Sequence, residues 1–160
     1  APPPGAPRRR AGPWPRAGGM SDWSEAVLGG DGRVYGVPDC AEAVLCLDPV
    51  AGEATTFGEV GAAAQKWSGA VLAGDGKLYC IPWSHQDVLC IDPAARSVSL
   101  LTPEANGISA ALTEDAVSSE HKWRGGVVAD DGRIYGVPWN ADAVLCVDPR
   151  DSLVLEVLEV

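Results

Sequence analysis

Short apolar runs separated by glycine, proline and aspartate make up most of this sequence. The run from Val88 to Ile91 is typical, because it is apolar throughout and is followed at once by Asp92-Pro93. Runs of this length between turn-forming residues are typical of β-strands. None approaches the roughly 20 apolar residues that a membrane-spanning helix needs. The pattern therefore predicts an all-β protein that does not insert into a membrane.

The same pattern of residues occurs three times without a gap, over 23–49, 67–93 and 123–149. Each copy opens on tryptophan, reaches an Asp-Gly pair and then a tyrosine, passes a proline and closes on Asp-Pro. Recurrence at one position indicates a structural role, so we assign the tryptophans to packing and the aspartates to turns. These repeat positions are Trp23, Trp67 and Trp123; Asp31, Asp75 and Asp131; and Tyr35, Tyr79 and Tyr135.

The spacing of the copies suits a four-stranded propeller blade or a helical HEAT-type repeat. Asp-Gly between two β-prone runs favours strands, because these residues accept positive φ in a hairpin turn. The next proline of each copy (Pro38, Pro82 and Pro138) lacks a backbone donor and should end the second strand. The middle strands are apolar at nearly every position, which favours stacked blades over a simple sandwich with one wet face. We predict three four-stranded antiparallel blades of a β-propeller.

The predicted blades cover about 22–66, 67–122 and 123–160. Residues 1–20 are rich in Pro, Gly and Arg and are expected to be disordered. An insertion over 102–121 separates the second copy from the third, and 108–117 is predicted as a short helix capped by Ser109. Closed propellers have four to eight blades, so this propeller is expected to be partial. Further blades or a second copy of the chain would close the ring.

The loop after each proline varies most between the copies, and such loops carry specificity in repeat proteins. Trp83 and Trp139 lie in this loop and are predicted to stack on a ligand. His85 and Asn140 are neighbouring candidates. A metal site of His85 with Asp87 and Cys80 is the alternative, but no paired ligand spacing supports it, and we favour a solvated loop histidine. No metal or cofactor is expected.

The charge of the chain and the placement of its cysteines limit the expected partners and indicate the cellular location. The net charge is −10, although residues 1–20 hold four arginines and no acid. The remaining acidic surface repels phosphate backbones, so nucleic acid is not an expected partner. Cys46, Cys90 and Cys146 recur inside apolar runs and are predicted to be buried and reduced. The opening segment lacks the apolar core of a secretory signal, which with unpaired cysteines favours an intracellular location.

The motif Trp-x-Gly-x-Val-Leu-Ala-x-Asp-Gly-x-Ile-Tyr-Gly-x-Pro…Val-Leu-x-Ile-Asp-Pro resembles the propeller repeats of the broad Kelch, YVTN and quinoprotein-like group. It looks especially like the tandem arrays of algal and other protist proteins, over about residues 22–160. The resemblance implies either a scaffold that binds a protein or small ligand at the blade loops, or a fragment of an enzyme of the lactonase or quinoprotein-dehydrogenase kind. The sequence shows no repeated ligand set and no catalytic constellation, which favours the binding module.

Overall fold

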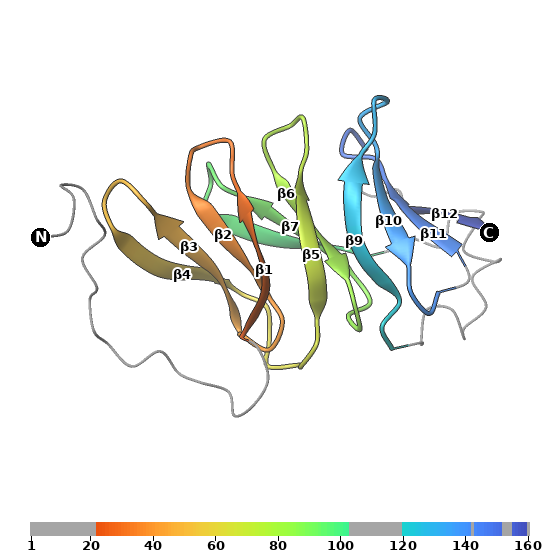
Figure 1. Cartoon of the computed structure of the whole chain (residues 1–160), viewed down its shortest axis with the longest axis horizontal. Coiled ribbons are helices and arrows are strands. Elements are labelled where there is room, and N and C mark those ends of the chain that lie inside the picture. The colour runs from red at the N-terminus through yellow and green to blue at the C-terminus, as the bar shows by residue number, and fades with distance from the viewer. Residues whose placement is uncertain (1–21, 103–119, 142, 152–154, 160) are drawn as a thin grey trace, which may run out of the picture.

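The computed structural model describes residues 22–102, 120–141, 143–151 and 155–159. The predicted disordered segment 1–20 and the predicted helix over 108–117 lie outside these residues. The described strands form three antiparallel sheets of four strands each, which stand side by side in chain order (Figure 1). This confirms the all-β prediction and the four-stranded antiparallel blades. Within the described ranges no helix is long and apolar enough to cross a membrane.

Each sheet is one blade, and its strands follow one another in space as they do in sequence. Blade 1 consists of β1 (Trp23–Leu28), β2 (Val34–Pro38), β3 (Ala43–Asp48) and β4 (Glu53–Glu59). Blade 2 consists of β5 (Trp67–Leu72), β6 (Leu78–Pro82), β7 (Val88–Asp92) and β8 (Ser97–Leu101). Blade 3 consists of β9 (Trp123–Val128), β10 (Ile134–Pro138), β11 (Ala143–Val147) and β12 (Leu155–Glu159). As predicted, the repeated prolines end β2, β6 and β10.

The Asp-Gly hairpins differ from the expected turn in one respect. Only the glycine has positive φ, at 79° for Gly32, whereas Asp31 is not among the described residues with positive φ. Gly32 N donates to Gly29 O at 3.1 Å, and Gly29 N donates to Arg33 O at 2.8 Å. The four-residue turn over 29–32 thus ends in a left-handed glycine, which is the pattern of a type I turn with a bulge. The aspartate serves through its side chain, which accepts from Arg33 N and from Tyr35 Oη.

The Asp-Pro turn at the end of the third strand is held by the aspartate that opens it. Asp48 Oδ1 accepts from Val50 N at 3.0 Å and from Ala51 N at 2.9 Å. Its other oxygen accepts from Arg33 Nε at 3.1 Å. The basic residue of the first hairpin therefore ties together the two turns of blade 1.

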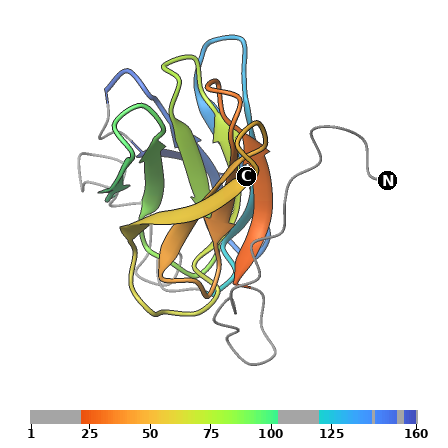
Figure 2. The same cartoon turned by 90° about the vertical axis from the view of Figure 1, so that its left-hand side faces the viewer.

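Each blade has two apolar faces of different composition, because side chains alternate across a strand. The Tyr face points to the following blade; in blade 1 its members are Tyr35, Val37, Val44 and Cys46. The Trp face points to the preceding blade; in blade 2 its members are Trp67, Leu78, Cys80, Leu89 and Ile91. These two sets form one core cluster, and the Tyr face of blade 2 packs against the Trp face of blade 3 in the other cluster. Figure 2 shows the stack from the blade 1 end.

Cysteines occupy both kinds of face. No disulfide joins any two of the five, all of which lie in the described ranges, and four of them are buried. Cys80 and Cys90 belong to opposite faces of blade 2, where burial raises the pKa of both thiols. Their surroundings therefore keep the protonated, unreactive form.

Candidate functional site

A chain of backbone hydrogen bonds runs through all three blades at the end where the repeated prolines lie. Asp39 N donates to Asp22 O at 3.0 Å, and Asp39 O accepts from Lys66 N of the next blade at 3.2 Å. Lys66 O accepts from Trp83 N at 2.8 Å, and Trp83 O accepts from Lys122 N at 2.7 Å. The residue after each proline and the residue before each tryptophan thus form the joint between blades.

Two lysines of this joint are buried, at 0% exposure for Lys66 and 1% for Lys122. Lys66 Nζ donates to Ala63 O at 2.6 Å, and Lys122 Nζ donates to His85 O at 2.8 Å. Burial lowers the pKa of both ammonium groups. Each ammonium also lies over the ring of the tryptophan that follows it, at 6.0 and 5.3 Å from the ring centre. These contacts offset part of the cost of burying a charge.

The residue before each lysine has left-handed backbone, at φ 56° for Gln65 and 61° for His121. The two side chains meet across the joint, where His121 Nε2 lies 3.0 Å from Gln65 Oε1. The His121 ring also stacks on Trp83, with ring centres 4.6 Å apart and an interplanar angle of 26°. His121 therefore holds one face of Trp83 in place.

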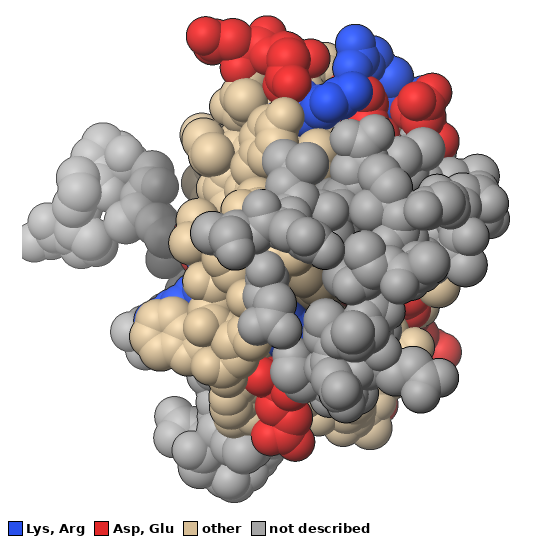
Figure 3. All heavy atoms as spheres, turned by 90° about the vertical axis from the view of Figure 1, so that its right-hand side faces the viewer, with Lys and Arg blue, Asp and Glu red and all other residues tan. Residues whose placement is uncertain are grey.

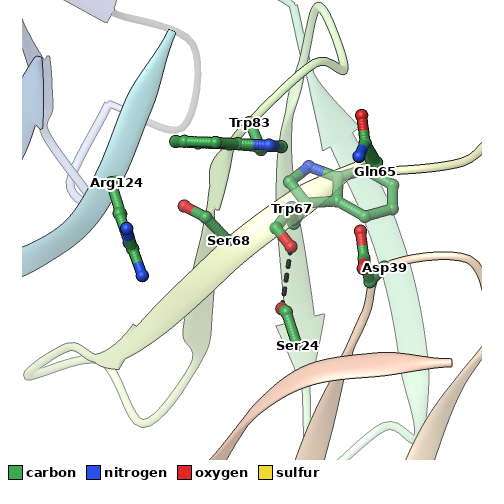
Figure 4. Close-up of a pocket in the computed structure, with 7 residues that line it drawn as sticks. All are labelled: Ser24, Asp39, Gln65, Trp67, Ser68, Trp83 and Arg124. Atoms are coloured by element: carbon green, nitrogen blue, oxygen red, sulfur yellow. Dashed lines mark hydrogen bonds between the residues drawn. The ribbon is translucent and has the colours of Figure 1, made fainter. Parts of the chain in front are cut away.

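A pocket of about 260 Å³ opens beside this joint (Figure 4). Trp83 forms one wall, with Ser68 and Arg124 on one side and Gln65, Trp67 and Asp39 on the other. The hydroxyls of Ser24 and Ser68 line its inner side, and each donates to the tryptophan carbonyl of the next blade, at 2.8 and 3.0 Å. All three blades contribute to the lining, and the inner strands β1, β5 and β9 supply much of it.

Arg124 brings a positive charge to a molecule that is acidic overall. Its guanidinium carbon lies 5.1 Å from the ring centre of Trp139. No hydrogen bond or ion pair joins this guanidinium to another residue that the structure describes. Stacking on Trp139 restricts the orientation of this guanidinium.

The structure brings together some of the predicted ligand-binding residues and separates others. Trp83 lines the pocket, and Trp139 lies beside it with ring centres 5.9 Å apart. Asn140 does not line the pocket; its side-chain nitrogen donates to Glu120 O at 3.1 Å.

His85 is not the solvated loop histidine that we expected. Its ring packs on Trp67, with ring centres 4.6 Å apart, and its Nδ1 accepts from Asp87 N at 3.0 Å. A neighbouring aromatic surface and a tight loop therefore leave only 20% of the side chain exposed. Across the residues that the structure describes, no three His, Cys, Asp or Glu side chains lie close enough together to hold a metal ion.

Sequence reasoning missed Arg124, Gln65 and the two buried lysines. The signal was present, because the second and third repeats can be extended backwards from the tryptophan to a Lys-Trp pair. Arg124 stands out only by comparison, since Ser24 and Ser68 occupy the same position after the tryptophan in the other two copies.

No protein-family model and no curated protein matches the sequence. Among solved structures, virginiamycin B lyase from Staphylococcus aureus is similar at a TM-score of 0.63 and 12% identity, over 84% of this chain and 40% of that chain. Kuenenia stuttgartiensis hydrazine synthase is similar at a TM-score of 0.61 and 14% identity, over 93% of this chain and 40% of that chain. A luciferin-regenerating enzyme is similar at a TM-score of 0.56 and 12% identity, over 85% of this chain and 45% of that chain.

At these identities the similarity concerns the fold alone. The chain spans less than half the length of each of these solved chains. The neighbours support the broad propeller group, and they do not distinguish the Kelch type within it. The residues that the structure describes form three antiparallel blades of a β-propeller, a part of such a fold.

Proposed function

We propose that this chain is a propeller module that binds a small planar ligand carrying an anionic group. The observation that carries the proposal is the pocket itself, in which the aromatic wall of Trp83 faces the same space as the guanidinium of Arg124. An aromatic surface with a few well-placed polar groups is the usual composition of a small-molecule site. The volume of about 260 Å³ fits a single-ring ligand.

Each part of the pocket has a distinct role in this proposal. Trp83 stacks on the ring of the ligand, and the stacking of His121 on its indole fixes the orientation of that indole. Arg124 pairs with the anionic group. Asp39 and the two serine hydroxyls supply acceptors, which favour a ligand with a hydroxyl or amino substituent opposite the anionic group.

The binding module and the enzyme predicted from the sequence are not equally supported. The solved enzymes that share the fold are 10–14% identical to this chain, so their activities are not evidence for its own. The resemblance to Kelch-like arrays of algal and protist proteins remains part of the proposal, since those repeats include scaffolds.

Titration with 4-hydroxybenzoate, followed by the indole N–H signals of the labelled protein, tests the proposed site. We expect the Trp83 signal to shift on titration with this anion and to shift less with the neutral 4-hydroxybenzamide. Arg124→Gln should weaken 4-hydroxybenzoate binding by about tenfold or more, since a charge-assisted hydrogen bond contributes about 1.5–3 kcal/mol. Lys77→Gln is the matched control, because it removes a positive charge near the Asp-Gly hairpin of blade 2, away from the pocket.

Equal binding of the anion and the amide, or an unchanged affinity in the Arg124 variant, would rule out the anionic ligand. A shift confined to tryptophans other than Trp83 would place the binding site elsewhere.

A further inference from the structure

The two outer faces of the blade stack are complementary to each other. Within the described ranges, no blade packs on the Trp face of blade 1 or on the Tyr face of blade 3 (Figure 1). Inside the molecule, a Tyr face packs on a Trp face at both junctions. We propose that the Tyr face of blade 3 binds the Trp face of blade 1 in a second copy of this chain.

Equivalent positions in the three blades show that each outer face has exposed apolar side chains that an interior face buries. Val137 of blade 3 is 60% exposed, whereas its equivalents Val37 and Ile81 are 0% exposed under the next blade. On the other outer face Leu47 is 36% exposed, and its equivalents Ile91 and Val147 are buried under the preceding blade. The residue types are those that the interior junctions already bury, so the exposed part of each face is suited to the same kind of apolar contact between copies.

The exposed part of the blade 3 face is its inner half. Val127 and Val137 are exposed there, on β9 and β10, while Cys146 on β11 is buried. Figure 3 shows this end of the molecule, where acidic and basic side chains lie at the upper edge, acidic side chains lie at the lower edge, and much of the described surface between them is uncharged. A surface without charge in its centre and with charge at its rim is typical of a protein interface.

The backbone joint offers a further contact between copies. Asp39 O and Trp83 O accept from the residue before the next tryptophan, and Trp139 O is the third member of this series. No described residue donates to Trp139 O.

Two copies joined in this way at both junctions form a closed ring of six blades. Closed propellers hold four to eight blades, so six lies within the range of the fold. A contact between different faces closes into a ring when the rotation per subunit allows it. The proposal is independent of the ligand pocket, which lies within one chain.

Sedimentation equilibrium of the full chain tests the proposal, with charge placed on each outer face in turn. We expect the unmodified chain to be a dimer at micromolar concentration. Val137→Asp and Leu47→Asp should each weaken dimerisation by about tenfold or more, since an unpaired charge is costly to bury. Val50→Asp is the matched control, because Val50 is 97% exposed in the turn after β3 and lies outside both faces.

Mixing the two variants distinguishes this arrangement from any other dimer. The Val137→Asp chain keeps an unmodified Trp face and the Leu47→Asp chain keeps an unmodified Tyr face. One unmodified junction can therefore form between them, and the mixture should dimerise when neither variant does alone. Melting curves of both variants, expected to match that of the unmodified chain, show that each is folded. A monomeric unmodified chain at 100 µM, or a mixture that stays monomeric, would overturn the proposal.

Discussion

The tyrosine of each repeat connects the core of its blade to the hairpin turn above it. Tyr79 is buried between blades 2 and 3, and its hydroxyl donates to Asp75 Oδ2 at 2.8 Å. The same bond joins Tyr35 to Asp31 at 2.8 Å. The aspartate that the sequence assigned to turn formation therefore has a second role, which only the three-dimensional fold shows.

Tyr79→Phe should lower the free energy of unfolding by about 1 kcal/mol at neutral pH, the usual contribution of one hydrogen bond. Burial, and then the hydrogen bond to Asp75, raises the pKa of Tyr79 in the folded protein. A raised folded pKa gives stability that is present below the unfolded pKa of about 10 and is lost as the pH rises above it. The difference between Tyr79→Phe and the unmodified chain should therefore shrink above pH 10.

Urea unfolding at pH 7 and at pH 10.5 measures this difference. In the Val137→Asp chain, which keeps the outer face of blade 3 uncovered, Tyr135→Phe is the matched control, because Tyr135 makes the same bond at 3.1 Å but is only half-buried. We expect a smaller loss for it at pH 7. A pH-independent difference for Tyr79→Phe would contradict the assignment.

Single residues were also where prediction from the sequence was weakest. Trp83 was identified because an aromatic residue in a variable loop is an unusual feature, and it lines the pocket. Lys66 and Lys122 were missed because a lysine is ordinarily assigned to the surface, and their burial depends on a joint between blades. His85 was misjudged for a related reason, since its stacking partner Trp67 lies outside the loop, at the start of β5.

At the scale of the strand and the turn, the sequence determined most of what the structure shows. Strand ends coincide with prolines because a proline cannot donate to the next strand. The detailed turn type was not predicted, because Asp-Gly is compatible with both a two-residue turn and a turn that ends in a left-handed glycine. The hydrogen bonds from Gly76 N to Ala73 O and from Ala73 N to Lys77 O identify the second.

Substitution of two glycines in one turn tests this geometry. Gly76 has a φ of 81°, and Gly74 is not among the residues with positive φ. Gly76→Ala should destabilise the protein by about 1 kcal/mol, the cost of left-handed backbone with a Cβ. Gly74→Ala should be neutral or slightly stabilising, since a Cβ there meets no atom within 4 Å.

Thermal or urea unfolding of the two variants measures the difference. If both alanines cost the same, the turn does not have the conformation described for Gly76.

For the molecule as a whole, the blades differ in how much of each is covered. Both faces of blade 2 lie within core clusters, whereas blades 1 and 3 each have one face so covered. The difference arises from position in the stack, and the expectation of a partial propeller already implied exposed outer faces on its first and last blades.

Amide hydrogen exchange should therefore be slowest in the middle of the molecule. We expect β6 and β7 to be protected more strongly than β2 and β3 of blade 1, because local opening requires loss of packing on two faces. The Val137→Asp chain is the suitable sample, since it should remain monomeric. Equal protection in blades 1 and 2 would show that the stack opens as a single unit.

The joint at the proline end also has a consequence for how such chains change in length. Lys66 and Lys122 occupy equivalent positions, and each is followed by a tryptophan. Removal of residues 67–122 would leave Lys66 followed by Trp123. Lys66 N would still donate to Asp39 O, and the Tyr face of blade 1 would pack on the Trp face of blade 3. Recombination between the repeats can therefore add or remove a whole blade without creating a new junction. A gene encoding this fold can gain or lose repeats while every product keeps the contacts that hold it together.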